Sequence, residues 1–177
     1  MIKNHHGMFI NKFQNYNLIK DKLINEIRVS PGRQLDDVTK TDWDGANYHH
    51  NSLYWNTIFP FIQESYNSIK LDSYKEYSNY VTVDWGYAWY QIYEKNSFHS
   101  YHTHPGCQYS NVFYVGLPNN KYQTEFFGIG KLNFEEGDLV TFPSYLLHRS
   151  PNNLEQNEKI VISFNTSFNC FTRFDRD

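Results

Sequence analysis

The chain has 177 residues and a net charge of −3, so it is long enough for one domain with a substantial core and carries no basic surplus of the kind that binds nucleic acid. Two cysteines, Cys107 and Cys170, are too few for a disulfide framework, and the sequence has neither a secretion signal nor an apolar run of about 18 residues. We therefore expect a cytoplasmic protein.

The first predicted element is an amphipathic helix over residues 17–29. Ile19, Leu23 and Ile27 recur every four residues with charged side chains between them, and a Ser-Pro-Gly sequence ends the pattern. Residues 31–50 are rich in Gly, Asp, Asn and His, which indicates a long loop. Long loops often carry function, so this segment is a candidate substrate-selecting lid over a cavity.

A second helix is predicted over residues 52–69. Pro60 suits a first helical turn, which places the start of the regular helix near Thr57. The expected apolar face consists of Leu53, Ile58, Ile62, Tyr66 and Ile69.

From Tyr80 onward, short runs of β-branched and aromatic residues alternate with turn sequences. Many short strands at even spacing are typical of a sandwich or barrel. We expect one domain over residues 1–177, mainly β, in which residues 1–75 form a helical support and loop and residues 76–170 form a cupin-like jelly roll. The predicted strands are 80–94, 109–117, 122–127, 138–142 and 159–168.

Three histidines are candidate metal ligands. His102 and His104 flank Thr103, and alternation along a strand places two such imidazoles on one face. His148 follows a predicted buried strand and lies at a strand edge, where it can close a three-point site. Three protein ligands leave coordination positions open for substrate or oxygen. His99 is the main rival for a place in this site, and incidental histidines at a polar strand end are the alternative reading.

Lys159 begins a strand with strict alternation. Lys159, Val161, Ser163 and Asn165 face one way, and the intervening apolar residues face the other. If the apolar set packs against a second layer, Lys159 lies inside the barrel, where a cation needs an anionic partner. The alternative is a lysine that extends its ammonium group to water.

From about residue 85 to residue 165 the chain resembles the iron(II)- and 2-oxoglutarate-dependent oxygenases, in particular a small branch from marine bacteria and their phages. The stretches that carry the resemblance are His102-Thr103-His104-Pro105-Gly106, Ser110 to Val115, Gly137 to Ser144, His148-Arg149-Ser150-Pro151 and Ile162-Ser163-Phe164-Asn165. They occur in the family's order and cover nearly half of the chain.

This resemblance implies a double-stranded β-helix that holds Fe(II) and uses 2-oxoglutarate and O2, with succinate and carbon dioxide as coproducts of a hydroxylation. His102 and His148 correspond to the family's two histidine ligands. His104 stands where the family has a carboxylate, so a site with all three histidines lacks one negative charge. Lys159 corresponds to the basic partner of the distal 2-oxoglutarate carboxylate, and we also assign Tyr93, Asn111 and Ser163 to the cosubstrate.

Two other classes stay open. A cupin with three histidines, acting as a dioxygenase or isomerase without 2-oxoglutarate, matches Gly137, Pro143, His148 and Asn152 but lacks the glutamate of the first cupin motif and needs no role for Lys159. A jelly roll without catalytic activity is the third possibility, because a fold does not fix a function. The substrate, a small molecule or a side chain, is not readable from the sequence, and a homodimer is compatible with the expected fold.

Overall fold

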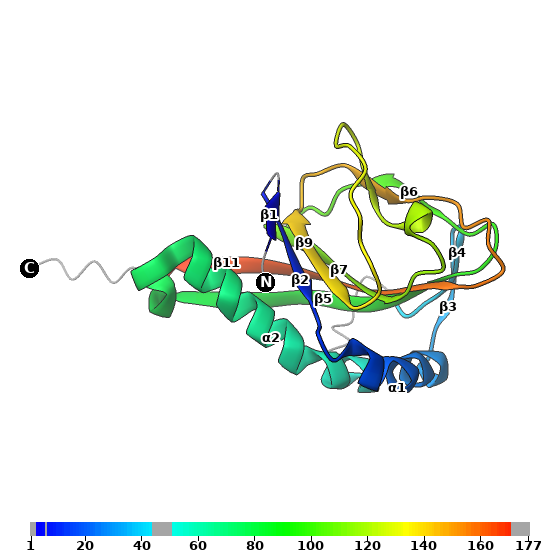
Figure 1. The fold of residues 1–177 in the computed structure, drawn as a ribbon, viewed down its shortest axis with the longest axis horizontal. Coiled ribbons are helices and arrows are strands. Elements are labelled where there is room, and N and C mark those ends of the chain that lie inside the picture. Colours follow the sequence, from blue (N-terminus) through cyan, green and yellow to red (C-terminus); the bar gives the residue numbers. More distant parts are fainter. Residues whose placement is uncertain (1–2, 6, 44–50, 171–177) are drawn as a thin grey trace, which may run out of the picture.

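The computed structural model describes residues 3–5, 7–43 and 51–170, and it is built on two antiparallel sheets (Figure 1). The large sheet has the strand order β1-β2-β9-β7-β11-β5-β4-β3, and the small sheet has the order β6-β10-β8. The strands are β1 (Lys3–His5), β2 (Met8–Lys12), β3 (Arg33–Leu35), β4 (Val38–Thr41), β5 (Val81–Tyr93), β6 (His99–His102), β7 (Tyr109–Gly116), β8 (Glu125–Phe126), β9 (Asp138–Pro143), β10 (His148–Ser150) and β11 (Lys159–Cys170).

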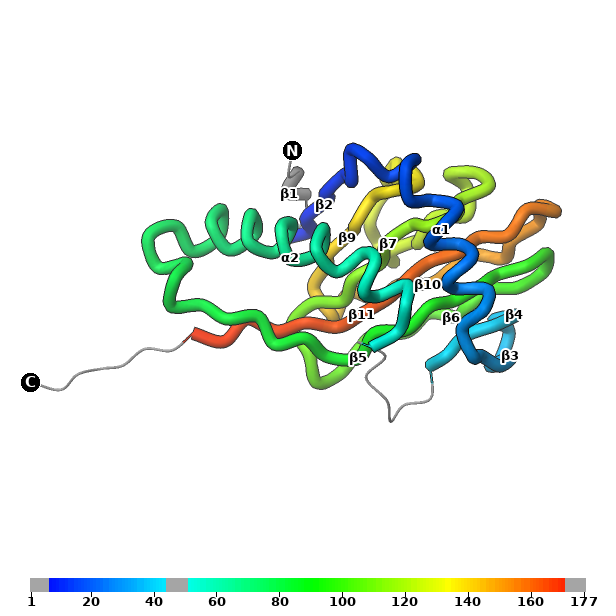
Figure 2. The backbone as a smooth tube through the Cα atoms, turned by 90° about the horizontal axis from the view of Figure 1, so that it is seen from below, coloured from blue at the N-terminus to red at the C-terminus, as the bar shows by residue number. Residues whose placement is uncertain are grey.

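Two α-helices, α1 (Tyr16–Val29) and α2 (Leu53–Tyr74), lie across one face of the large sheet (Figure 2). Short 3-10 helices occupy Lys75–Tyr80 and Asn120–Tyr122. One apolar core fills the space between the helices and the large sheet, and a second, smaller core lies on the sheet's other face. Within the described residues, neither α-helix is long and apolar enough to cross a membrane.

The first predicted helix is confirmed, and the second differs from the prediction at its start. Helix α2 begins at Leu53, so Pro60 lies in the helix interior instead of the first turn. An interior proline costs about 3 kcal/mol, whereas burial of Tyr54 and Trp55, at most 2% exposed, contributes roughly 1.5–3 kcal/mol for each large side chain. Packing therefore extends the helix past the proline. Leu53, expected on the buried face, is 59% exposed.

The segment 31–50 was expected to be a loop, and this was wrong for its first part. Strands β3 and β4 form a hairpin that joins the edge of the large sheet, where Thr41 pairs with Gln91 of β5. Residues 44–50 of the expected lid lie outside the described residues. The N-terminal part also supplies β1 and β2, with β2 paired to β9, so residues 1–75 contribute strands as well as helices.

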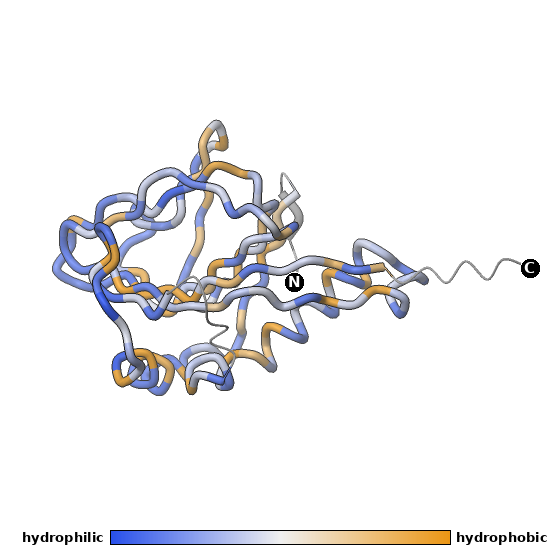
Figure 3. The backbone as a smooth tube through the Cα atoms, turned by 180° about the vertical axis from the view of Figure 1, so that it is seen from behind, coloured by the Kyte–Doolittle hydropathy of each residue, from blue (hydrophilic) through white to orange (hydrophobic). Residues whose placement is uncertain are grey.

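The predicted β-rich region is confirmed, and β11 forms its centre. The predicted strand 122–127 is the exception, because only Glu125–Phe126 form a strand there and Tyr122 ends a 3-10 helix. Strand β11 pairs with β5 on one side and β7 on the other. Ile160, Ile162 and Phe164 belong to the core under the helices, while Lys159, Val161, Ser163 and Asn165 line a cavity on the other face, as the alternation predicts. Figure 3 shows hydrophobic and hydrophilic stretches succeeding one another along the strands and helices.

A buried polar cluster joins helix α2 to the large sheet. The hydroxyl of Tyr66, 1% exposed, donates to Asn111 Oδ1 at 2.8 Å and lies 2.5 Å from Thr166 Oγ1. Thr141 Oγ1 donates to the same Asn111 oxygen at 2.6 Å. These bonds satisfy side chains that are otherwise surrounded by the apolar core.

Replacing Tyr66 with Phe should therefore lower the free energy of unfolding by about 1–3 kcal/mol, because buried groups lose a hydrogen-bond partner. Denaturant unfolding measures the change. Tyr77→Phe is the matched control, since Tyr77 is 65% exposed. Equal stability of the Tyr66→Phe and Tyr77→Phe variants would contradict the role given to this cluster.

Candidate metal centre

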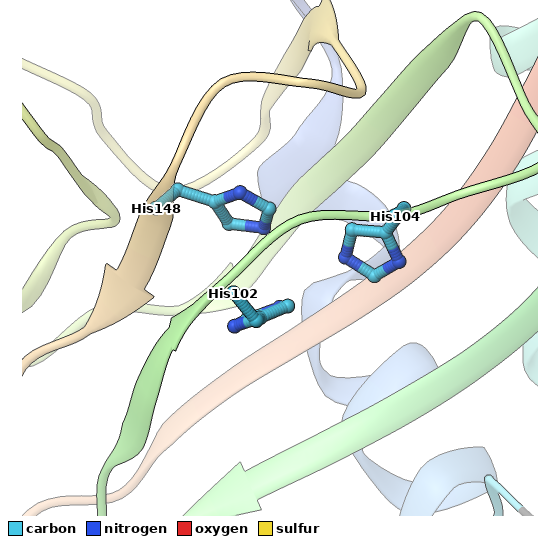
Figure 4. A group of neighbouring side chains, drawn as sticks. All are labelled: His102, His104 and His148. Atoms are coloured by element: carbon cyan, nitrogen blue, oxygen red, sulfur yellow. The ribbon is translucent and has the colours of Figure 1, made fainter.

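The three predicted ligands meet where the small sheet faces the large one. Antiparallel pairing of β6 with β10 sets His102 directly opposite His148. His104 lies beyond the end of β6 rather than on the same strand face as expected, and its backbone N–H donates to Ser144 O at 3.1 Å. Figure 4 shows the three imidazole rings around a shared space.

The spacing of these rings suits one metal ion. The ligand atoms of His102, His104 and His148 all lie within 4.8 Å of one another. Metal–nitrogen bonds of about 2.1 Å hold two ligand nitrogens at most about 4.2 Å apart, so small ring rotations complete the site. His102 and His148 are the tighter pair, with ring centroids 4.3 Å apart.

Backbone carbonyl groups fix two of the rings in the tautomer that binds metal. His102 Nδ1 lies 2.7 Å from Ser100 O, and His148 Nδ1 lies 2.8 Å from Leu146 O. A carbonyl oxygen only accepts, so each Nδ1 carries the proton and each Nε2 keeps a free lone pair. Among the described residues His104 has no such anchor, and its ring lies against Trp89 with centroids 5.7 Å apart.

Burial keeps the rings uncharged. Desolvation lowers the pKa of His148 to about 3 and the pKa of His104 to about 4, and it also lowers the pKa of His102. All three imidazoles are therefore neutral at pH 7, which is the form that coordinates a metal ion.

His99 is close to the group without belonging to it. Its ring stacks on His102 with centroids 4.0 Å apart, and its Nδ1 lies 3.5 Å from Gln91 Nε2. The cluster whose ligand atoms converge contains only His102, His104 and His148 among the described residues. This geometry favours His99 as a neighbour of the metal site.

Lys159 lies inside the protein, in the same cavity as the three histidines. It is 1% exposed, its Nζ donates to Ser150 Oγ at 2.7 Å, and it lies 5.2 Å from the centroid of the Tyr93 ring. No carboxylate forms an ion pair with it in the part of the chain that the structure describes. Burial lowers the pKa of Lys159 to about 7, as expected for an ammonium group without a charged partner.

Tyr93 and Ser163, both expected at the cosubstrate, line this cavity. Ser163 Oγ donates to Gln91 Oε1 at 3.2 Å. Sequence reasoning missed Ser150 and Gln91. Ser150 lies two residues after His148, and Gln91 lies two residues before Tyr93. Side chains two residues apart on a strand share a face, so the sequence already indicated that both residues face the cavity.

Asn111 has a different environment from the one expected. It borders the cavity, but its side chain belongs to the cluster with Tyr66 on the helix side of the sheet. Its Nδ2 donates to Phe164 O at 3.1 Å, and its Oδ1 accepts from Tyr66 and Thr141. The alternation of β7 explains the difference, because Val112 and Tyr114 take the cavity side and Asn111 takes the other. The amide groups of Asn111 are thus already hydrogen-bonded on the helix side, and its assignment to the cosubstrate stays a prediction.

No family model matches the sequence, and no curated protein matches it. Several solved structures share its fold. A viral collagen prolyl hydroxylase from Paramecium Bursaria Chlorella virus-1 is 15% identical with a TM-score of 0.58, covering 89% of this chain and 94% of that one. A Pseudomonas putida prolyl-4-hydroxylase is 13% identical with a TM-score of 0.61, covering 90% and 92%. An oxidoreductase of the 2OG-Fe(II) oxygenase family from Burkholderia pseudomallei is 11% identical with a TM-score of 0.62, covering 91% and 84%.

These similarities confirm the expected fold class. The chain has the double-stranded β-helix fold found in 2-oxoglutarate and Fe(II) oxygenases, with N-terminal helices packed on the large sheet. At such low identity the likeness concerns the fold alone, and the chemistry has to be argued from the site.

The geometry predicts that substitutions of two neighbouring histidines, His148 and His99, have different effects on metal binding. His148→Ala should abolish binding of one equivalent of Co(II) or Fe(II), because it removes a ligand from the centre of the group. His99→Ala should retain one equivalent, because His99 lies outside it. Metal content after anaerobic loading and gel filtration measures both, with circular dichroism as the folding control. Full metal content in His148→Ala would refute the assignment.

Proposed function

We propose that the protein is an Fe(II)- and 2-oxoglutarate-dependent dioxygenase that hydroxylates a small-molecule or side-chain substrate. The observation that carries the proposal is the pairing of a three-histidine group with a buried lysine in one cavity. A metal site explains the histidines alone, but it does not explain why a cation is buried beside them.

The donors lining the cavity suit a molecule with an anionic end. The volume of the cavity in the ligand-free protein is about 30 Å³, room for about one water molecule, so a larger ligand enters only when the lining side chains move apart. Lys159 and the hydroxyl of Ser150 provide donors at one part of its wall, and the histidines provide the metal site at another. 2-Oxoglutarate has a keto acid for the metal and a second carboxylate for Lys159, so its two ends match the chemistry of the two parts of the wall.

The donor set also fits the metal. Imidazole is a suitable ligand for iron, and three protein ligands leave room for the cosubstrate and oxygen. His104 supplies no negative charge, so the carboxylates of 2-oxoglutarate are the anions that balance the metal charge in this cavity. When bound, Fe(II) supplies the oxygen chemistry, in which decarboxylation of 2-oxoglutarate to succinate and carbon dioxide is coupled to substrate hydroxylation.

The chain's own residues hold and orient the reactants. Ser100 and Leu146 carbonyl groups fix the His102 and His148 rings, so the ligand nitrogens point inward before metal arrives. Lys159 fixes the far end of the cosubstrate and keeps a proton there, because a bound carboxylate raises the pKa of the ammonium group. The surrounding apolar side chains of the core between the sheets exclude water.

The cupin alternative does not explain why Lys159 is buried in the cavity. A buried lysine with no anionic partner destabilises the fold, and a three-histidine cupin site has no need of it. The binding-module alternative likewise gives no reason for neutral, carbonyl-anchored imidazoles. Both observations favour the 2-oxoglutarate-dependent reaction.

Anaerobic titration of the Fe(II)-loaded protein with 2-oxoglutarate tests the proposal directly. We expect a weak visible absorption band from the chelated keto acid in the wild type and none in His148→Ala. Bound Fe(II) without any band at saturating 2-oxoglutarate would contradict the proposal and favour the cupin chemistry.

Lys159→Met should weaken the binding of 2-oxoglutarate and at the same time stabilise the ligand-free protein. The variant should bind 2-oxoglutarate roughly 30-fold more weakly or worse, because the distal carboxylate loses its charged partner. The ligand-free protein should become about 1–3 kcal/mol more stable, because a buried unpaired charge is replaced by an apolar chain. Calorimetric titration and denaturant unfolding measure the two effects. Lys95→Met, at an exposed position, is the matched control. A variant that loses stability and keeps its 2-oxoglutarate affinity would reverse both expectations.

The affinity for 2-oxoglutarate should fall as pH rises above 7. The pKa of Lys159 in the empty cavity is lowered to about 7, so the ammonium group that binds the carboxylate is progressively lost between pH 7 and 9. The expected decrease approaches a factor of about ten per pH unit. Lys159→Arg should flatten the profile, because arginine stays protonated. Parallel pH profiles for the wild type and Lys159→Arg would assign the dependence to another group.

A further inference from the structure

A second, larger pocket lies on the outer side of the histidine group. Its volume is about 290 Å³, and it shares Trp89, Gln91 and the rings of His99, His102 and His104 with the inner cavity. Lys159 lines only the inner cavity, and Asp36 lines only the outer pocket. The histidines therefore form a common wall, so a molecule in the outer pocket approaches the metal site from the side away from Lys159.

Apolar and aromatic side chains form most of the outer pocket's wall. Leu35 and Val38 come from the β3–β4 hairpin, and Trp43 follows β4. Trp43 is 39% exposed and Trp89 is 6% exposed, which places one indole near solvent and the other deep inside. A cavity of about 150 Å³ holds benzene, so 290 Å³ accommodates a six-membered ring with a short chain.

The charges of the wall select among such molecules. Asp36 is the only aspartate, glutamate, lysine or arginine among the described residues that line the outer pocket. It lies at the turn between β3 and β4 with φ of 49° and is exposed. A carboxylate, together with the face of an exposed indole, attracts a cation. The described part of the same wall has no lysine or arginine to hold an anion.

We propose that the outer pocket binds the substrate and that the substrate is a ring compound, or a side chain, that carries an amine. The ring packs against Trp89, and the amine lies at the rim between Asp36 and Trp43. This orientation is the favourable one, because a divalent metal ion on the far wall repels the amine and leaves the apolar carbons nearest to His102 and His104. The assignment of the oxidised end rests on the proposed function, whereas binding in the pocket does not.

Three probes of similar size test the proposal on the whole protein without metal or 2-oxoglutarate: phenethylamine, 2-phenylethanol and 3-phenylpropionate. Titrations followed by the NMR signals of the indole N–H groups report on all four tryptophans. We expect phenethylamine to bind at least threefold more tightly than the alcohol and tenfold more tightly than the acid. The signals of Trp43 and Trp89 should shift. Those of Trp55 and Trp85, which pack on the helix side of the sheet, should not.

Two variants test whether Asp36 causes the preference for the amine. Asp36→Asn should bring the affinity for phenethylamine to that for 2-phenylethanol, and asparagine tolerates the positive φ at this position. Asp37→Asn is the matched control, since Asp37 does not line the pocket, and it should retain the preference. Equal binding of the amine and the acid, or an amine preference that survives in Asp36→Asn, would overturn the proposal.

The outcome is separable from that of the proposed function. Amine binding without the absorption band of Fe(II)-bound 2-oxoglutarate would support the pocket and refute the dioxygenase. A normal band with no preference for the amine would refute the pocket alone.

Discussion

The two faces of β11 have incompatible environments, and the register of this strand keeps them apart. One face contributes Ile160, Ile162 and Phe164 to the core under the helices, and the other presents Lys159 and Ser163 to the cavity. A slip of one residue would exchange the faces and bury the polar set against the helices. The strand pairs with β5 from Lys159 to Cys170 and with β7 from Ile160 to Thr166, and the burial of its apolar face fixes this register. The placement of Lys159, the one lysine among the described residues that line the cavity, depends on this register.

The two sheets contribute different residues to the site. The small sheet and the turn after β6 provide His102, His104 and His148, and the large sheet provides Lys159, Tyr93 and Ser163. The cavity between them is thus bounded by rigid hydrogen-bonded strands on opposite sides. Such a support orders the ligand groups in advance, so little conformational entropy remains to be lost when metal and cosubstrate bind.

Much of this arrangement was predictable from the sequence, because it depends on local periodicity. The helix over residues 17–29 and the alternation from Lys159 follow from spacing alone. Spacing also selects the three histidines, although His104 lies beyond the end of β6 and not on the expected strand face. Strands β1 to β4, β6 and β10 were absent from the predicted ranges, since each has at most five residues and is too short for a clear alternation. They form where neighbouring strands of a sheet provide pairing partners. The interior Pro60 and the outward Leu53 were missed for a related reason, because the packing of α2 against the sheet decides them. Asn111 lies in one of the matching stretches, and its side chain is bonded to Tyr66 of α2 on the helix side of the sheet, which the matching stretch did not indicate.

The position of β11 also has a consequence for biosynthesis. This strand is the last described strand in the chain, yet it lies in the middle of the large sheet between β5 and β7. Its partner residues in β5 precede it by a long stretch of sequence, as in the pairing of Cys170 with Val81. During translation the ribosome releases β5, β7 and β9 before the strand that joins β5 to β7 exists. The growing polypeptide therefore carries unpaired strand edges until residues 159–170 emerge, and for that interval it depends on fast completion or on chaperones to avoid aggregation.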